Sequence, residues 1–254
     1  MMLLVDIGNS RVKWATLDNG RLGEQQAAAY EGWSVQEWRR ALFDRPGIER
    51  VLAASVAGGP VAETLARAAE IETRSPVRFV AGERETAGVR SGYADHRLLG
   101  VDRWLAVVAA YRSVRGACCV ADIGTAATFD AVTGGGQHLG GFIVPGPALM
   151  MRSLWRGTAD LAERTASSGT AAEAPLADNT RDAIERGCLL AVAAFVDRGV
   201  AEVRRRLGIE PTLLLTGGGA AVLRPLIGTR CEEVPDLVLR GLAAVAEAAP
   251  GPGV

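Results

Sequence analysis

Two aspartates stand at matching positions in this sequence: each ends an apolar run and is followed at once by a glycine turn. Asp6 opens the triplet Asp-Ile-Gly, and the same triplet recurs at Asp122. Two carboxylates facing one another across a cleft would suit Mg²⁺, which keeps several waters and bridges phosphate oxygens. Gly8 and Gly124 would let backbone amides approach those phosphates. The alternative is that both aspartates only cap turns; their repetition favours the ion site.

A cationic stretch follows the first turn. Lys13 is the only lysine in the chain, because Arg supplies 27 of the 28 basic residues. Arg11 and Lys13 alternate with apolar Val12 and Trp14, so a strand would place both cations on one face. On that face Lys13 would meet terminal phosphates as a point charge. An equally supported alternative is that Lys13 lies on a solvated edge strand.

Hydroxyl and glycine groups occupy the corresponding places later in the chain. Thr125 and Thr128 follow the second turn and offer hydroxyls to a phosphate oxygen or a coordinated water. The run 217–219 is Gly-Gly-Gly directly after an apolar strand, where a flat adenine could lie against backbone. A Rossmann-type pyrophosphate turn is the weaker alternative, because the G-x-G-x-x-G spacing is absent.

A third candidate position is the start of an apolar helix. Asp102 and Arg103 precede Trp104 and Leu105, and the positive end of a helix dipole stabilises a carboxylate there. In the alternative interpretation Asp102 is an ordinary first-turn acid and Arg103 is solvated. This segment alone does not decide between the two.

Local patterns predict the elements that must position these groups. The N-terminal segment reads as a strand, a turn, a second strand and an Asp-Asn-Gly hairpin signal. Ser34 and Glu37 form a capping box, which predicts a helix over 34–43. The strand–helix–strand pattern predicted over 50–80 is typical of parallel strand pairing. We expect helices at about 60–70, 101–112, 147–161, 179–207 and 236–248, strands at 50–55, 77–80 and 211–219, and a loop over 82–99.

The chain then repeats its opening at an offset of 116 residues (122 minus 6). The same offset superposes the hairpin signal at 18–20 on the glycines at 134–136, so strand, turn, strand and hairpin recur without a gap. Duplication explains this better than chance. We predict two related halves: residues 1–115 with the first phosphate loop, and residues 116–254 with the second phosphate loop and the adenine-side glycine turn.

Composition narrows the class of protein. At about 150 residues per domain, 254 residues allow one large domain or two modest ones. The 28 basic and 29 acidic residues leave a net charge of −1, so no summed field draws the chain to nucleic acid or to an anionic membrane. Apolar runs are too short to span a bilayer, and a signal peptide's basic region is missing. We expect a cytoplasmic protein.

Cysteine and histidine usage restricts the chemistry. The four cysteines have no CxxC spacing, and the two histidines have no partners at a ligand-like spacing. We therefore expect free structural thiols. Carboxylates, backbone amides and a bound ion remain as the chemical groups.

Five motifs, together and in order over nearly the whole chain, resemble the type III pantothenate kinases, a family also called Bvg accessory factor-like. Single D-x-G turns occur throughout the actin and sugar-kinase superfamily, so the joint occurrence carries the specificity. The resemblance implies an α/β, duplicated ribonuclease-H-like (actin-like ATPase) fold around an interdomain cleft, ATP as donor, pantothenate as acceptor, and a homodimer. The motifs are D-x-G-N-[ST] at 6–10, G-x-D-R at 100–103, D-x-G-T-A-x-T at 122–128, G-G-x-I-x-P-G at 140–146 and N-T at 179–180.

The resemblance also implies roles for individual residues. Asp102 matches the proton acceptor, Asp122 a monovalent-cation ligand for K⁺ or NH₄⁺, and Asp6 lies in the vicinity of Mg²⁺. Arg103 is a natural partner for the pantothenate carboxylate. The family often has Thr at the position of Ser10, and the serine keeps the hydroxyl group. The implied ATP-binding residues are Asp6, Ile7, Gly8, Asn9, Ser10, Arg11, Val12, Lys13 and Thr125; the implied pantothenate-binding residues are Tyr93, Gly100, Val101, Asp102, Arg103 and Thr180.

The resemblance thus implies a phosphotransferase that makes 4'-phosphopantothenate in the first step of coenzyme A biosynthesis. One alternative is a non-catalytic nucleotide-binding regulator, since members of this family have been labelled transcriptional accessory factors. The chain keeps the family's site residues and has no basic nucleic-acid face, which argues against that. A superfamily kinase for another small hydroxy compound is harder to exclude, because only Tyr93, Arg103 and Thr180 point to pantothenate.

Overall fold

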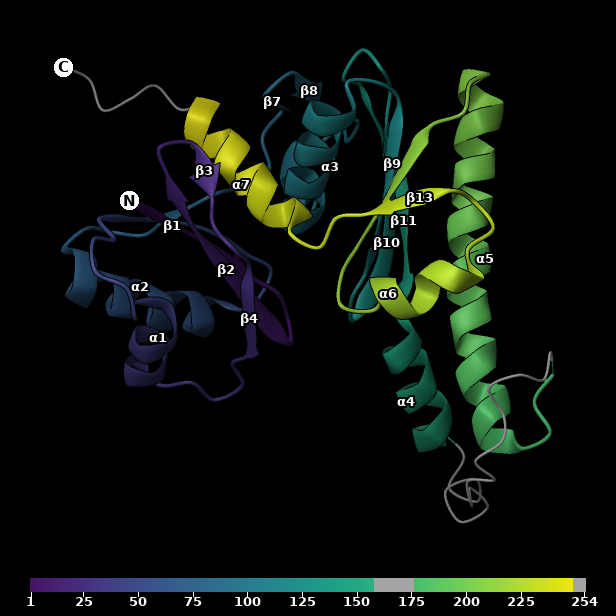
Figure 1. The fold of residues 1–254 in the computed structure, drawn as a ribbon, viewed down its shortest axis with the longest axis horizontal. Helices are drawn as coiled ribbons and strands as arrows, with labels where there is room; N and C mark the ends of the chain where they lie inside the picture. Colours follow the sequence, from purple (N-terminus) through teal and green to yellow (C-terminus); the bar gives the residue numbers. More distant parts are fainter. Residues whose placement is uncertain (158–175, 249–254) are drawn as a thin grey trace. The chain divides into compact units, whose positions relative to one another are not determined.

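The computed structural model describes residues 1–157 and 176–248, which fall into two compact α/β units (Figure 1). Unit 1 comprises Met1–Ala117, Val132–Gly140 and the segment that begins at Asp236. Unit 2 comprises Cys118–Ala131 and Gly141–Pro235. Among these described residues, no helix is long and apolar enough to cross a bilayer.

The sheet of unit 1 has the strand order β3-β2-β1-β5-β6, with β4 also paired to β2. β1 is antiparallel to β2 and parallel to β5, as expected for a meander followed by a helical crossover. The sequence prediction of a strand at 50–55 is confirmed residue for residue by β5. The strands are β1 (Met2–Ile7), β2 (Arg11–Asp18), β3 (Arg21–Leu22), β4 (Gln26–Ala29), β5 (Arg50–Ser55) and β6 (Arg78–Phe79).

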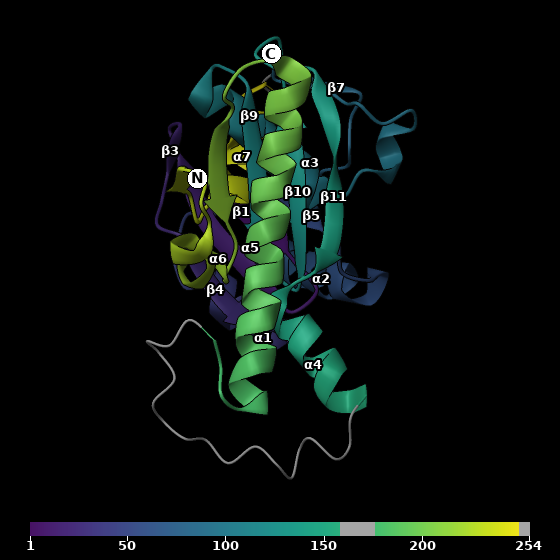
Figure 2. The same cartoon turned by 90° about the vertical axis from the view of Figure 1, so that its right-hand side faces the viewer.

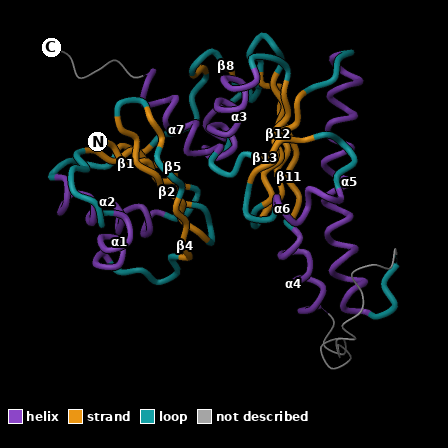
Figure 3. Tube along the Cα trace, viewed as in Figure 1, coloured by secondary structure: helices purple, strands orange, loops and turns teal. Residues whose placement is uncertain are grey.

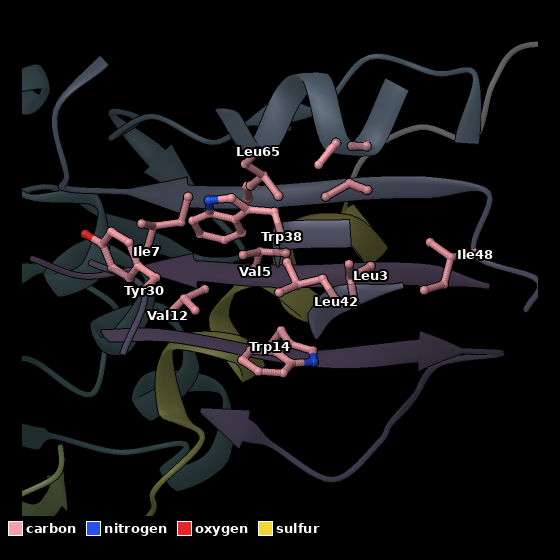
Figure 4. Packing of buried hydrophobic residues seen from close by; sticks show 14 residues of the cluster. Leu3, Val5, Ile7, Val12, Trp14, Tyr30, Trp38, Leu42, Ile48 and Leu65 are labelled. Carbon is pink, nitrogen blue, oxygen red and sulfur yellow. The ribbon is translucent and has the colours of Figure 1, made fainter. Parts of the chain in front are cut away.

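Helices α1 (Val35–Leu42) and α2 (Gly59–Thr73) cover one face of this sheet. The predicted capping box is present: the Ser34 hydroxyl accepts from the Glu37 amide, and the Glu37 carboxylate accepts from the Ser34 amide at 2.7 Å. Figure 4 shows Trp38 over the alternate side chains that β1 directs to this face. Burial of this cluster holds the two helices on the sheet.

The predicted helix at 101–112 is α3 (Val101–Val114), and the predicted closing helix is α7 (Leu237–Ala248). The two pack against each other so closely that a Cβ at Gly241 would lie 2.3 Å from the Leu105 carbonyl oxygen. α7 also contacts β1, β2 and β5. It therefore belongs to unit 1, whereas the sequence division placed it in the second half, because helical periodicity does not say which surface a helix will cover.

The segment predicted as a loop over 82–99 contains regular pieces: β7 (Glu85–Thr86), β8 (Val89–Arg90) and the 3₁₀ turn η1 (His96–Leu98). The Arg90 amide donates to the Gly136 carbonyl at 2.8 Å, and Arg90 also forms a bridge with Gln137. These bonds join the segment to the hairpin tip at 132–140, which is why that tip belongs to unit 1.

The sheet of unit 2, whose strands are drawn in orange in Figure 3, has the order β11-β10-β9-β12-β13, which repeats the order of unit 1 strand for strand. β9 spans the residues of β1 shifted by the predicted 116, and β12 is parallel to β9 and to β13. The duplication is thus a property of the fold. The strands are β9 (Cys118–Ile123), β10 (Ala126–Val132), β11 (His138–Pro145), β12 (Thr212–Thr216) and β13 (Cys231–Glu233).

The long helix α5 (Thr180–Leu207) runs along the sheet of unit 2 (Figure 2). Phe129 of β10 packs edge-on against Phe195, and a Cβ at Gly199 would lie 2.8 Å from the Phe129 ring. The remaining elements are α4 (Pro147–Gly157), α6 (Ala220–Leu223) and η3 (Arg224–Leu226). The predicted continuation of α4 over 158–161 lies outside the described residues.

Candidate functional site

Two hydrogen bonds at Gly8 hold the first predicted phosphate turn in place. Asp6 is buried near the end of β1, and the Gly8 amide donates to the Arg11 carbonyl at 3.0 Å. The Tyr30 hydroxyl donates to the Gly8 carbonyl at 2.5 Å, and burial raises the pKa of Tyr30, which keeps that donor protonated. The turn is therefore braced, while its tip residues Asn9 and Ser10 are exposed.

Asp6 and Lys13 lie directly opposite each other in the antiparallel pair β1–β2. Opposite residues direct their side chains to the same face, and here it is the face turned away from α1 and α2, since Ile7 and Val12 belong to the core on the other face. β2 has β1 on one side and β3 and β4 on the other. The edge-strand alternative for Lys13 is thus wrong, and the alternation of Lys13 with Val12 and Trp14 is confirmed.

The start of α3 carries a carboxylate and a buried guanidinium. Asp102 is half-buried in the first helical turn, and its Oδ1 accepts from the Arg103 amide at 2.8 Å. Arg103 is only 7% exposed, so the alternative of a solvated arginine is wrong. Its Nη1 donates to the Tyr93 hydroxyl at 3.0 Å. The structure thus brings Tyr93 into contact with the 100–103 motif, as expected if both line one pocket.

The Tyr93 ring stacks on His138, with centroids 6.1 Å apart and planes 15° apart. His138 is 1% exposed. Sequence reasoning missed this residue because it comes from the second repeat, 45 residues along the chain from Tyr93, at no recognisable ligand spacing. The only signal available was a polar ring at the start of a strand.

The second predicted phosphate turn follows β9. The Gly124 amide donates to the Ala126 carbonyl at 3.0 Å, two residues on, whereas Gly8 reaches three residues on. The hairpins also differ: Asn19 and Gly20 form a two-residue turn with positive φ, while Thr133 and Gln137 close a wider one. The prediction of a gapless repeat is therefore correct for β1 and β9, but wrong at the glycine turn and at the hairpin.

Gly146 and Gly217 pack closely against the second turn. A Cβ at Gly146 would lie 2.2 Å from the Gly124 carbonyl oxygen, and the Gly146 amide donates to the Thr125 carbonyl at 2.9 Å. Gly217 has a φ of +92°, and its Cβ would lie 2.3 Å from Asp122 Oδ1. Two segments far apart in the sequence thus pack against the second turn, Gly146 on its backbone and Gly217 on the Asp122 carboxylate. The sequence assigned the run at 217–219 to adenine and offered no sign of this contact.

The donor sets fit the expected ions. Within residues 1–157 and 176–248, no group of three or more His, Cys, Asp or Glu side chains is placed to hold a metal. One carboxylate per turn suits Mg²⁺, which binds through few carboxylates, waters and phosphates. Asp122 Oδ1 and the Ile123 carbonyl oxygen both lie within 2.6 Å of the place where a Gly217 Cβ would stand. Such neighbouring oxygens suit a monovalent cation such as K⁺.

Thr180 is the first residue of α5 in unit 2, directly after the N-cap Asn179, whose side chain accepts from the Asp182 amide at 3.0 Å. It lines an open, mainly apolar groove of about 830 Å³ between α4 and α5. The groove was not predicted, because the sequence does not show that these helices pair. Other lining residues include Pro145, Leu149, Met150, Leu154, Ile184 and Cys188.

Known proteins resemble this chain along almost its whole length. The type III pantothenate kinase family model matches residues 2–202. A type III pantothenate kinase from Nitrosococcus oceani is 38% identical over 253 residues, covering 97% of this chain and 94% of the relative. One from Chromobacterium violaceum is 41% identical over 254 residues, covering 97% and 99%.

Among solved structures, the activator of the 2-hydroxyisocaproyl-CoA dehydratase from Clostridium difficile with bound ADPNP is similar, with a TM-score of 0.53 and 12% identity over 97% of this chain and 93% of that one. Such a likeness speaks for the fold alone. Together with the repeated strand order, it shows the duplicated fold of the actin-like ATPases and sugar kinases. The family match and the curated relatives go further: this chain belongs to the type III pantothenate kinase family.

Proposed function

We propose that this protein transfers the γ-phosphoryl group of ATP to the primary hydroxyl of pantothenate, yielding 4'-phosphopantothenate and ADP in the first step of coenzyme A biosynthesis. Membership of the family supports this activity. The start of α3 is the observation that supports this activity at the site. There the Asp102 carboxylate adjoins buried Arg103, whose guanidinium donates a hydrogen bond to the Tyr93 hydroxyl.

Asp102 is proposed as the proton acceptor. Its Oδ1 is engaged by the Arg103 amide, whereas its Oδ2 makes no hydrogen bond to any described residue. This carboxylate lies in the first turn of α3, where the positive end of the helix dipole attracts negative charge. As the hydroxyl oxygen attacks the γ-phosphorus in line, its proton passes to Oδ2 while the bond from the phosphorus to the ADP oxygen breaks.

Arg103 is proposed to orient the acceptor through its carboxylate. A guanidinium presents several donors in a fixed plane and binds carboxylates more specifically than an ammonium does. Because Arg103 is buried and bonded to the Tyr93 hydroxyl, its side chain is ordered before a ligand arrives. Such preorganisation lowers the entropy cost of aligning the hydroxyl with the phosphate.

The first turn and Lys13 are proposed to bind the ATP phosphates. The tip of the loop offers the exposed residues Asn9, Ser10 and Arg11. Lys13 adds positive charge on the face it shares with Asp6, close to where Mg²⁺ would be held. Mg²⁺, when bound with ATP, neutralises phosphate charge. Asp122, beside the Ile123 carbonyl oxygen, would hold K⁺ or NH₄⁺, and Thr125 would contact the nucleotide.

We also propose a cytoplasmic homodimer that binds neither nucleic acid nor membranes. The apolar groove between α4 and α5, with exposed Leu154 and Trp155 beside it, supports a second copy as its cover. The paired arginine and glutamate side chains near the end of α5 support a solvated surface there. A gel-filtration and light-scattering mass of one chain at micromolar concentration would refute the dimer.

The activity test is an ADP-release assay that offers pantothenate, a panel of sugars or no acceptor, with and without K⁺. The proposal expects ADP release that depends on pantothenate and is stimulated by the cation. Release with a sugar alone would favour a kinase for another hydroxy compound. Nucleotide binding without release under any condition would favour a regulator.

A further inference from the structure

His138 lies behind the proposed acceptor pocket without any part in the proposed chemistry. It opens β11, is 1% exposed and presents its ring to the Tyr93 ring at a centroid distance of 6.1 Å with 15° between the planes. This is an offset stack of the kind that aromatic rings prefer. One face of Tyr93 is therefore supported by a buried, flat partner.

The backbone around His138 leaves its ring little freedom. The Gly92 amide donates to His138 Nδ1 at 3.4 Å, and a Cβ at Gly92 would lie 2.3 Å from the His138 carbonyl oxygen. The Gln137 side-chain amide donates to the same carbonyl at 2.9 Å. The loop before Tyr93 and the start of β11 are thus in direct backbone contact, which defines the height and tilt of the imidazole under Tyr93.

Tyr93 passes this order on to Arg103. Its hydroxyl accepts from Arg103 Nη1 at 3.0 Å, and the guanidinium carbon lies 5.8 Å from the Tyr93 ring centroid. A tyrosine free to turn about its side-chain bonds would carry the hydroxyl away from that donor. The contacts therefore form one series, from His138 through Tyr93 to Arg103.

We infer that His138 is a positioning residue for the acceptor: by stacking on Tyr93 it keeps the Arg103 guanidinium aimed at the carboxylate of the acid that is phosphorylated. The inference rests on the proposed function, since it needs Arg103 to bind that carboxylate. It assigns no contact between His138 and the substrate. The stack, rather than the Nδ1 hydrogen bond, is the feature that matters.

Two substitutions separate the stack from the hydrogen bond. His138→Phe keeps a flat ring and loses the Nδ1 acceptor, whereas His138→Asn keeps a short acceptor and loses the ring. We expect the Asn variant to raise the Kd and KM for pantothenate about threefold to tenfold, the range expected for one aromatic stack. The Phe variant should stay within about twofold of the parent protein. KM for ATP should not change in either.

A double substitution tests whether His138 acts through Tyr93. If it does, His138→Asn adds nothing to the pantothenate Kd once Tyr93→Leu is in place, so the two effects are non-additive. His96→Leu is the matched control, because His96 is the other histidine and lies on η1 in the same segment without contact to Tyr93 in the described structure. Calorimetric titration of pantothenate into each variant gives Kd without turnover.

The outcomes distinguish the two proposals. A parent protein without pantothenate-dependent ADP release overturns the proposed function. An active parent whose His138→Asn variant keeps its pantothenate Kd, or whose Phe variant loses affinity while Asn does not, overturns the role of the stack alone. A merely structural His138 would lower the active fraction, and hence apparent kcat, in both variants while leaving Kd for pantothenate unchanged.

Discussion

Asp6 and Lys13 face each other across β1 and β2, so the only lysine of the chain shares a sheet face with the carboxylate of the first turn. β2 is an internal strand of the sheet. The face that carries Asp6 and Lys13 is the one opposite the core formed with α1 and α2. A cation beside a carboxylate at the mouth of a glycine turn is suited to phosphates that carry their own metal ion.

Replacing Lys13 with Met should raise KM for ATP about tenfold, because a half-buried positive charge near the phosphates is lost while the aliphatic stem is kept. KM for pantothenate should stay near that of the parent. Arg21→Met, at an exposed position on β3, is the charge-matched control. Equal effects of the two substitutions on KM for ATP would remove Lys13 from the site.

Asp102→Asn should lower kcat by about 10²–10⁴-fold, the usual contribution of a positioned general base. ATP binding, followed by fluorescence of a nucleotide analogue, should be nearly unchanged. Asp95→Asn makes the same chemical change in the preceding segment, where Asp95 caps η1 and pairs with Arg97. Near-normal turnover of Asp102→Asn would rule out this carboxylate as the base.

Gly217→Ala should destabilise the protein more than Gly208→Ala. Both glycines have positive φ, so both substitutions strain the backbone by about 1 kcal/mol. A Cβ has open space at Gly208 but would lie 2.3 Å from Asp122 Oδ1 at Gly217. Urea unfolding should show a lower midpoint for Gly217→Ala, and its activity should need more K⁺. Equal midpoints would mean that the turn around Asp122 shifts to accommodate the added Cβ without loss of stability.

Ser34→Ala removes the capping box of α1 and should cost about 1 kcal/mol of unfolding free energy at pH 7. Hydrogen bonds from the backbone and then the side chain of Ser34 lower the pKa of Glu37. A lowered folded-state pKa gives a contribution that is present above the unfolded pKa, about 4.3, and is lost as the pH falls through the folded value. The difference from the parent should therefore shrink in acid. Ser113→Ala, late in α3, is the control without a cap.

Local patterns predicted the elements of this fold well. The capping box at Ser34, the hairpin signal at Asn19-Gly20 and the strand at 50–55 are decided by neighbours in sequence. The repeat offset also predicted that Asp6 and Asp122 end equivalent strands. Such features need no knowledge of tertiary contacts.

What the sequence left open depends on tertiary contacts. The membership of α7 in unit 1 is decided by the close approach of Gly241 to Leu105, and the stack of His138 on Tyr93 by the joining of two distant loops. The contact of Gly217 with Asp122 is of the same kind. The local failures, the different glycine turns and the wider second hairpin, arose because a motif match reports residue types and not which amide reaches which carbonyl.

The order of the chain has a temporal consequence for its synthesis. The polypeptide passes between the units at residues 117/118, 131/132, 140/141 and 235/236, so unit 1 is begun first and finished last. The 122 residues between Val114, the end of α3, and Leu237, the start of α7, take about 6–25 s to translate at about 5–20 residues per second. During that interval the surface around Leu105 has no α7 to cover it. A nascent chain of this protein therefore has to keep an apolar helix face from aggregating, alone or on a chaperone, until α7 leaves the ribosome.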